Sequence, residues 1–382
     1  MAHVRRTPAG NWQVRYRDPA GIERARTFSR KGDAEKFMVT IEADKLRGLW
    51  ADPNLARTTI NEWLPTWQTG RVHLRASTRE SEASLLRNHV LPYFGTRRLG
   101  AVTPNDVQQF VAHLHEKGLS PATTRLAYMI VQGMFSTAVE SDLIPRSPCR
   151  GIKLPQSLPT EMRFLTTEEV SRLADAIDRQ YRAFILTAAY TGCRFGELAG
   201  LRRHRLDLAR RTLTVAESLA EVNGYVHVTP PKTAAGRRRI ALPEGLSHEL
   251  AEHLEEWPPS SDGLVFTAQR GGPLLNRNFR DRLWLPAVRA SVGEPMRFHD
   301  LRHTHAAILI AQGEHPKVIQ HRLGHSSIKV TLDTYGHLFE GLDEAAAQRL
   351  DAAWDGHSLT RPGGRGSPES PSSLDLGRRL ER

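Results

Sequence analysis

The chain has 382 residues, of which 39% are hydrophobic, and this length allows two or three domains with cores of their own. Its 53 Lys and Arg exceed its 42 Asp and Glu to give a formal net charge of +11, which favours a polyanionic partner such as nucleic acid, with a merely basic surface as the alternative. Two cysteines exclude a disulfide framework and a four-thiolate zinc site, and the lack of a long apolar run predicts a cytoplasmic protein with no membrane partner.

Residues 1–50 are predicted to form a small basic module with a net charge of +5. Alternating apolar and polar residues predict strands over residues 11–17 and 23–28, joined by a turn, and a helix follows over residues 32–47. The cationic strand face of this hairpin suits a DNA groove, and an ordinary solvated hairpin is the alternative.

The rest of the chain divides into a helical part, a linker, a mixed domain and a tail. Residues 58–144 carry apolar residues at helical spacing in four segments. The first begins at Thr59, a capping signal at Ser77 precedes the second, and the third and fourth open at Thr103 and Ser120. Residues 145–162 hold four Pro and no clear period, which predicts a linker. Residues 163–355 predict a larger mixed domain, and residues 356–382, rich in Gly, Pro, Ser and Arg, a disordered tail.

Four segments of the second half carry candidate chemistry, and the first is Thr-Gly-Cys-Arg-Phe-Gly-Glu-Leu at residues 191–198. Gly192 lets the backbone turn, so that a new helix can begin at Arg194. A cation at a helix N-terminus is unfavourable with the helix dipole unless an anion is shared by the guanidinium and the helix start. An ordinary surface ion pair between Arg194 and Glu197 is the alternative.

The second segment, residues 226–242, predicts a β-hairpin with Lys232 on its rim. A hairpin tip can carry an ammonium into a groove, but a solvated lysine is the usual outcome.

The third segment, Arg-Phe-His-Asp-Leu-Arg-His-Thr-His-Ala at residues 297–306, crowds titratable groups together. His299 and Arg302 share a helix face at spacing i,i+3. His299 and His303 have the i,i+4 spacing of a zinc pair, so a metal-dependent nuclease built on these two and Asp300 stays open. No Cys lies nearby and no Glu takes the place of a general base, so His303 and His305 are predicted to be structural or DNA-facing.

The fourth segment, residues 323–335, opens on Leu-Gly-His and ends on Tyr335. Gly324 is predicted to end one helix and Ser326 to cap the next. Periodicity alone makes Tyr335 a core residue. The helices between residues 300 and 335 also resemble a helix-turn-helix, which would make the chain a non-catalytic DNA-binding regulator.

Together, the four segments supply two Arg, one Lys, two His and one Tyr, a set that suits attack on a phosphodiester. Two guanidiniums can hold the non-bridging oxygens in the transition state without a metal ion. A phenol with a pKa of about 10 needs a base or a cationic pocket before it attacks. A phenol–phosphate link conserves the bond for rejoining, and a lysine can give the leaving oxygen its proton.

These segments, in this order along the chain, resemble those of the tyrosine recombinase (phage integrase) family. Residues 163–355 look like its catalytic domain, residues 58–144 like its helical, SAM-like core-binding domain, and residues 1–50 like the arm-binding domain of integrases. The resemblance implies a mainly α fold with small β parts, in which the catalytic domain is mixed α+β.

The resemblance also implies roles for the residues. Tyr335 is similar to the nucleophile that forms a 3′-phosphotyrosyl link, and Arg194 and Arg302 look like the phosphate clamps. Lys232 looks like the general acid for the 5′-hydroxyl.

Two histidines complete the implied set. His299 looks like the base that helps deprotonate Tyr335, and His325 like a hydrogen-bond donor to the phosphate. Neither a metal ion nor another cofactor is expected.

The function implied is that of a site-specific integrase, which works as a homotetramer on double-stranded DNA attachment sites, with a recombination directionality factor as a possible partner. The alternative within the family is a chromosome dimer resolvase. Resolvases resemble only the core-binding and catalytic parts, so residues 1–50 favour an integrase.

Overall fold

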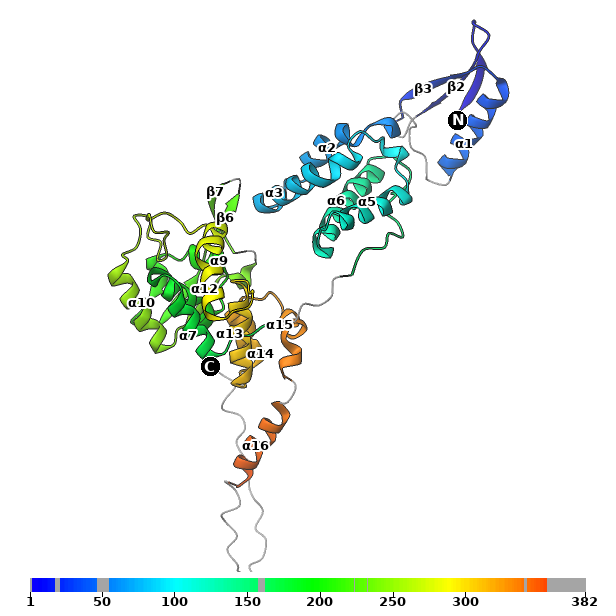
Figure 1. Cartoon of the computed structure of the whole chain (residues 1–382). Helices are drawn as coiled ribbons and strands as arrows, with labels where there is room; N and C mark the ends of the chain where they lie inside the picture. Colours follow the sequence, from blue (N-terminus) through cyan, green and yellow to red (C-terminus); the bar gives the residue numbers. More distant parts are fainter. Residues whose placement is uncertain are drawn as a thin grey trace, which may run out of the picture. The chain divides into compact units, whose positions relative to one another are not determined.

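Two units make up the fold, Met1–Met162 with Leu219–Val228 and Arg163–Ser218 with Thr229–Arg382. The structure, a computed structural model, describes residues 2–17, 21–46, 55–156, 162–222, 224–231, 233–339 and 342–355 (Figure 1). The predicted tail lies outside these residues. In the described part of the chain, no helix is long and apolar enough to cross a membrane.

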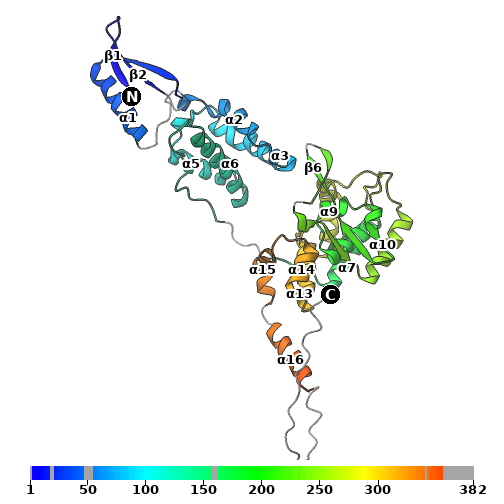
Figure 2. The same cartoon turned by 180° about the vertical axis from the view of Figure 1, so that it is seen from behind.

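The N-terminal module is a three-stranded antiparallel sheet beside one helix (Figure 2). Its elements are β1 (His3–Arg6), β2 (Trp12–Arg17), β3 (Glu23–Phe28) and α1 (Lys31–Leu46). Val14, Tyr16 and residues of α1 form its buried core. The predicted two-stranded hairpin was therefore incomplete. Strand β1 has a single apolar residue, Val4, which pairs with Val14, and one residue gives no alternation to detect.

The helical part of the first unit consists of helices and helical turns around one core. Its elements are η1 (Leu55–Arg57), α2 (Ile60–Thr69), α3 (Ala76–Leu85), the π-helical turn η2 (Leu86–Val90), α4 (Leu91–Phe94), η3 (Leu99–Ala101), α5 (Pro104–Glu116) and α6 (Pro121–Glu140). A core of aromatic and aliphatic side chains joins them, and the Trp63 indole N–H donates to the Met134 carbonyl over 3.3 Å.

Three of the four predicted helix starts in this part are confirmed. Thr59 and Thr103 form capping boxes, and Ser120 accepts the Thr123 backbone N–H. The predicted cap at Ser77 is wrong, because α3 begins at Ala76 with Arg75 as N-cap and no side-chain hydrogen bond. A cap contributes only about 1 kcal/mol, so packing of the helix can override it.

The second unit is mixed, with many helices around a small sheet. Its first elements are α7 (Thr167–Ala176), η4 (Arg179–Tyr181), α8 (Arg182–Thr191), α9 (Phe195–Ala199), η5 (Arg203–Arg205), β4 (Leu206–Asp207), β5 (Thr212–Val215), η6 (Ala234–Gly236), β8 (Arg238–Ala241) and α10 (Glu244–Glu256). Strands β6 (Ser218–Val222) and β7 (Tyr225–Thr229) come between β5 and η6 in the sequence, and their segment Leu219–Val228 groups with the first unit. The later elements are α11 (Asn276–Phe279), η7 (Arg280–Trp284), α12 (Leu285–Ser291), α13 (Asp300–Ala311), α14 (Pro316–Leu323), α15 (Ile328–Tyr335), η8 (Gly336–Phe339) and α16 (Leu342–Asp355).

The predicted hairpin over residues 226–242 is wrong in its pairing. Strand β7 pairs with β6, whereas β8 pairs with β5 in a sheet of order β4-β5-β8. The burial pattern gives the reason. Ile240 lies opposite Leu213, and both are buried, so β8 needs a partner with an apolar face that the largely exposed β7 does not have.

Gly192 makes the turn that separates α8 from α9. It has φ of +67°, and its N–H bonds to the Ala188 carbonyl, so it ends α8 in the left-handed conformation. A Cβ at this position would lie 2.7 Å from His305 Cδ2 and 2.8 Å from Leu323 Cδ2. The predicted turn is confirmed, and its glycine lets α13 and α14 approach closely.

We expect Gly192→Ala to destabilise the second unit by more than the about 1–2 kcal/mol of a left-handed alanine, because the new Cβ also displaces two buried side chains. Hydrogen exchange of the α8 and α13 amides in the full chain measures the loss. Gly293→Ala is the matched control, because Gly293 has φ of +80° and a Cβ added there would meet nothing within 4 Å. Equal effects of the two substitutions would contradict the close-approach argument.

Candidate active site

Arg302 is buried at the centre of the site and ties three elements together. Only 2% of this residue is exposed, and its guanidinium donates to the Gly192 carbonyl over 2.7 Å and to the Leu323 carbonyl over 2.5 Å. It thus links α13 to the ends of α8 and α14. Burial, with the nearby Arg194 charge, lowers the pKa of Arg302 to about 9.

The start of α9 holds a second guanidinium. Arg194 is the N-cap residue, and both its backbone N–H and its Nη1 donate to the Glu197 carboxylate over 2.9 Å. The predicted ion pair between Arg194 and Glu197 is therefore present, but the Glu197 side chain is only 4% exposed, so the pair holds a buried carboxylate and is not an ordinary surface pair. The Arg194 side chain is 41% exposed, which leaves its outer face open to a ligand.

Arg238 is the partner that the sequence analysis missed. It is buried on β8 and donates to both oxygens of Glu197, over 3.2 and 2.9 Å. Burial alone would raise the pKa of Glu197, but the hydrogen bonds and charges of Arg238 and Arg194 hold it below the ordinary value. Arg238 stands among three consecutive arginines, and the signal that could have found it is its inward position two residues before Ile240.

Arg238 also braces the backbone around the site. Its Nε donates to the Arg322 carbonyl over 2.6 Å, and its Nη1 donates to the Gly236 carbonyl over 3.1 Å. It therefore joins α9, the end of α14 and the turn before β8. Lys232 precedes this turn and lies outside the described residues.

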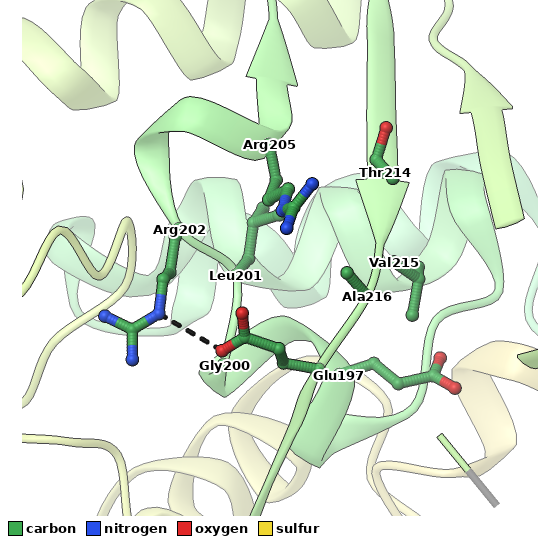
Figure 3. A pocket seen from close by; sticks show the side chains of 9 residues that line it. Glu197, Gly200, Leu201, Arg202, Arg205, Thr214, Val215 and Ala216 are labelled. Carbon is green, nitrogen blue, oxygen red and sulfur yellow. Dashed lines mark hydrogen bonds and ion pairs between the residues drawn. The ribbon is translucent and has the colours of Figure 1, made fainter. Parts of the chain in front are cut away.

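A small pocket is lined by Glu197 together with residues of η5 and β5 (Figure 3). Arg202 donates to Glu217 there over 3.2 Å, the contact drawn as a dashed line in Figure 3. The buried Nε of Arg205, which also lines the pocket, has no hydrogen-bond partner among the described residues. The pocket lies beside the Glu197 carboxylate, and its lining adds no further candidate site residue.

Tyr335 ends α15 and is 1% exposed. Its hydroxyl lies 2.8 Å from Nδ1 of His303 on α13. Burial raises the pKa of Tyr335 to about 12, although the Arg302 and Arg194 charges oppose this. Periodicity alone made this residue a core tyrosine, and it is indeed buried, but its polar end meets a histidine rather than an apolar core.

The Tyr335 hydroxyl is hydrogen-bonded to His303 and not to His299, to which the resemblance gave the base role. His299 is the N-cap residue of α13, one position before the helix, and its ring packs edge-on against His303 with centroids 5.1 Å apart. Burial and then the charges of His303, Arg302 and Arg194 lower the pKa of His299 to about 4.

His325 lies in the turn between α14 and α15. Gly324 ends α14 in the left-handed conformation as predicted, but Ser327 and not Ser326 caps α15. His325 Nδ1 is 2.9 Å from the Thr331 hydroxyl. Burial and then the charges of Arg302, Arg194 and Arg238 lower the pKa of His325 to about 4.

His305 has a structural role, which is one of the two roles predicted for it. It is buried, with Nδ1 3.1 Å from the Ala189 carbonyl, and Nε2 accepts a hydrogen bond from Arg322 over 3.1 Å. Burial and the Arg322 charge lower the pKa of His305 to about 3.

The geometry does not favour the metal-dependent alternative. The Asp300 carboxylate accepts hydrogen bonds from the Arg297 backbone and guanidinium, each over 2.7 Å. Within the described ranges, no group of three or more His, Cys, Asp or Glu could hold a metal ion. The site is instead a concentration of guanidiniums and imidazoles around one tyrosine.

Comparison with known families matches three parts of the chain. Residues 163–341 match the phage integrase family, residues 2–47 the phage integrase N-terminal domain, and residues 57–115 the phage integrase N-terminal SAM-like domain. The chain belongs to the tyrosine recombinase (phage integrase) family.

Curated relatives match over most of the chain. The putative prophage phiRv2 integrase of Mycobacterium tuberculosis is 29% identical over 92% of this chain and 95% of its own. The ICEBs1 integrase of Bacillus subtilis is 28% identical over 71% of this chain and 77% of its own. The integrase of Mycobacterium phage L5 is 26% identical over 90% of this chain and 95% of its own.

Solved structures share the fold. The Tn1549 transposon integrase in complex with transposon right end DNA matches with a TM-score of 0.66 and 23% identity, over 78% of this chain and all of that chain. A lambda integrase tetramer bound to a Holliday junction matches with a TM-score of 0.55 and 19% identity, over 85% and 95% of the two chains. Both likenesses confirm the mainly helical fold with small sheets.

We expect Arg238→Met to destabilise the second unit by about 3–5 kcal/mol, because it leaves the Glu197 carboxylate buried with one guanidinium fewer. Adding Glu197→Gln to this variant should recover part of the loss, since it removes the stranded charge. Hydrogen exchange of the α8 and α13 amides measures both. Arg239→Met, on the exposed side of the same strand, is the control. A loss no larger than that of Arg239→Met would contradict the bracing role.

The stability of the second unit should also fall as the pH is lowered. The pKa of His305 is about 3 in the fold against an ordinary 6.5, so below pH 6.5 the unfolded chain binds a proton that the folded chain does not. His325 acts in the same direction down to about pH 4. Exchange-derived free energies between pH 7.5 and pH 5 test this, and His305→Asn should flatten the slope. An unchanged slope in that variant would show that His305 does not titrate on unfolding.

Proposed function

We propose that this chain is a site-specific DNA recombinase, an integrase that cleaves and rejoins DNA strands through a 3′-phosphotyrosyl intermediate. The observation that carries the proposal is the setting of Tyr335. Its hydroxyl meets an imidazole at 2.8 Å, and the charges of Arg302 and Arg194 act on it against burial. A phenol held between a base and cations is equipped to attack a phosphodiester.

Arg194 and Arg302 form the phosphate clamp in this proposal. Arg302 uses one N–H on each terminal nitrogen for a carbonyl, and a guanidinium has five N–H donors, so others stay available. Arg194 presents its open face. Their charges stabilise the non-bridging oxygens as negative charge develops.

The depressed pKa values of the histidines support an anion site. His299 and His325, each with a pKa of about 4, are neutral at pH 7 because burial and guanidiniums disfavour their protonation. A phosphodiester would offset those charges and raise both pKa values. We therefore keep both in the catalytic set, with His325 as a hydrogen-bond donor to the phosphate, and Lys232 as the acid for the 5′-oxygen.

The other parts of the chain would bind DNA. We assign arm-type binding to residues 1–50, core-site binding to residues 58–144 and catalysis to residues 163–355, with residues 145–162 as the linker. Several relatives are integrases of prophages, phages or a mobile element, which supports integration and excision of such an element. The match of residues 2–47 favours an integrase over a chromosome dimer resolvase.

The working assembly in this proposal is a homotetramer on two synapsed attachment sites in the cytoplasm. The lambda integrase relative was solved as a tetramer on a Holliday junction, which supports this assembly. A recombination directionality factor would select excision.

A suicide DNA substrate, which traps the cleaved strand, tests the function. We expect the wild-type chain to form a covalent adduct that persists in EDTA, and Tyr335→Phe to form none. Arg302→Ala should slow adduct formation by on the order of a hundredfold or more, as the loss of a charge-stabilising donor does. Tyr225→Phe, at an exposed tyrosine of β7, is the matched control and should leave the rate unchanged.

The other outcomes separate the alternatives. Binding without an adduct would favour the non-catalytic regulator. Strand cleavage that EDTA abolishes would favour the metal-dependent nuclease.

A further inference from the structure

His303 is the one histidine in contact with Tyr335 among the described residues, yet the roles above leave it unused. Its Nδ1 lies 2.8 Å from the tyrosine hydroxyl, with ring centroids 5.7 Å apart and planes at 61°. It follows Arg302 directly on α13, and the two carbonyls that hold Arg302 fix this turn of the helix. The hydrogen bond between His303 and Tyr335 is therefore held in place by the fold around the site.

We propose that His303 is the catalytic base that takes the proton of Tyr335 as its oxygen attacks the scissile phosphorus. This rests on the proposed function. The Tyr335 oxygen–phosphorus bond forms, the phosphorus–5′-oxygen bond breaks, and the Tyr335 proton moves to Nδ1 of His303. The leaving 5′-oxygen takes its proton from a separate acid, Lys232 in the set above. In rejoining, the 5′-hydroxyl attacks the phosphorus and gives its proton back to the separate acid, Lys232 in the set above, while the phosphorus–Tyr335 bond breaks and His303 returns its proton to the leaving phenolate.

The neighbouring histidines are less well placed for this step. His299 packs its ring against His303, one ring away from the hydroxyl. His325 has its Nδ1 on the Thr331 hydroxyl. Among the described histidines, His303 alone brings a ring nitrogen within hydrogen-bond reach of the oxygen that reacts, which is the first requirement of a general base.

The electrostatic surroundings keep His303 neutral and able to accept. Burial lowers its pKa below the ordinary 6.5, Asp300 raises it, and Arg297 and Arg302 lower it further. His299 faces it from the start of α13, and Tyr335 faces it from α15. A proton on Nε2 then leaves Nδ1 free to accept the phenol proton. Tyr335, with its pKa raised to about 12, needs such a base at neutral pH.

The expected pH dependence of adduct formation follows from the lowered pKa of His303. A base acts in its neutral form, so adduct formation should rise with pH through an inflection below 6.5 and stay level near pH 7. Protonation of His303 at lower pH removes the acceptor.

His303→Asn tests the proposal in the full chain with the suicide substrate. The amide can place a hydrogen-bonding group where Nδ1 lies, but it cannot take the proton. We expect adduct formation at pH 7 to slow by about a hundredfold or more, and the low-pH inflection to disappear. His248→Asn, at an exposed histidine of α10, is the matched control and should match the wild type.

A 5′-bridging phosphorothiolate substrate separates base from acid. Its thiolate leaving group needs no proton, so the defect of Lys232→Ala should be relieved while that of His303→Asn persists. A merely structural role would lower the rate at every pH and keep the inflection, and that result would overturn the proposal.

The outcomes keep the two proposals apart. If the wild-type chain forms no covalent adduct, the proposed function itself is wrong. A wild-type adduct with an unchanged rate and pH profile in His303→Asn would remove only the base role. If His303→Asn does not bind DNA, the wild-type profile on the phosphorothiolate substrate decides. A rate that falls as the pH is lowered below 6.5 supports the base, and a rate that does not fall on the acid side overturns it.

Discussion

The Glu197 carboxylate accepts hydrogen bonds from two guanidiniums, and the rest of the site depends on this one buried anion. Arg238 holds it from the inside of β8, and Arg194 holds it from the start of α9. Without it, the site would bring Arg194, Arg238 and Arg302 together with nothing to offset their repulsion. With it, Arg194 is fixed at a helix start, where a cation alone is disfavoured. The sequence offered two alternatives for Arg194, an anion-binding arginine at a helix start and an ion pair with Glu197. In the structure, Arg194 stands at the helix start and forms the ion pair as well.

That anion offsets only part of the charge. The Arg302 guanidinium is satisfied by two neutral carbonyls rather than by a carboxylate, so its charge is solvated locally and not cancelled. The pKa values of His299, His305 and His325 fall to about 4, 3 and 4, with burial as the first cause and guanidinium charges among the others. The cationic charge that keeps these histidines neutral is not fully balanced, so the site can accept the negative charge of one more anion. A phosphodiester has the charge and the acceptor geometry that the remaining N–H donors require.

Local chemistry could predict much of this from the sequence. Gly192 and Gly324 end their helices as expected, because only glycine adopts that conformation readily, and the segments that carry Arg194, Arg302 and Leu323 do meet. The pairing of β8 with β5 could not be predicted, since two strands far apart in sequence choose each other by their buried faces. Arg238 was hidden for the same reason. His303 was set aside as a zinc ligand without a partner, because the tyrosine it meets is 32 residues away.

Burial of Tyr335 and the cations around it act in opposite directions, and this opposition explains why a base is needed. Burial disfavours the phenolate and raises the pKa to about 12, whereas Arg302 and Arg194 favour the phenolate and lower it. The protonated phenol therefore prevails in the free protein at neutral pH. An incoming phosphate would further weaken the help from the two arginines, because it offsets their charge. In the proposed reaction, the proton leaves as the bond to phosphorus forms, and Nδ1 of His303 is the acceptor already within hydrogen-bond distance, at 2.8 Å.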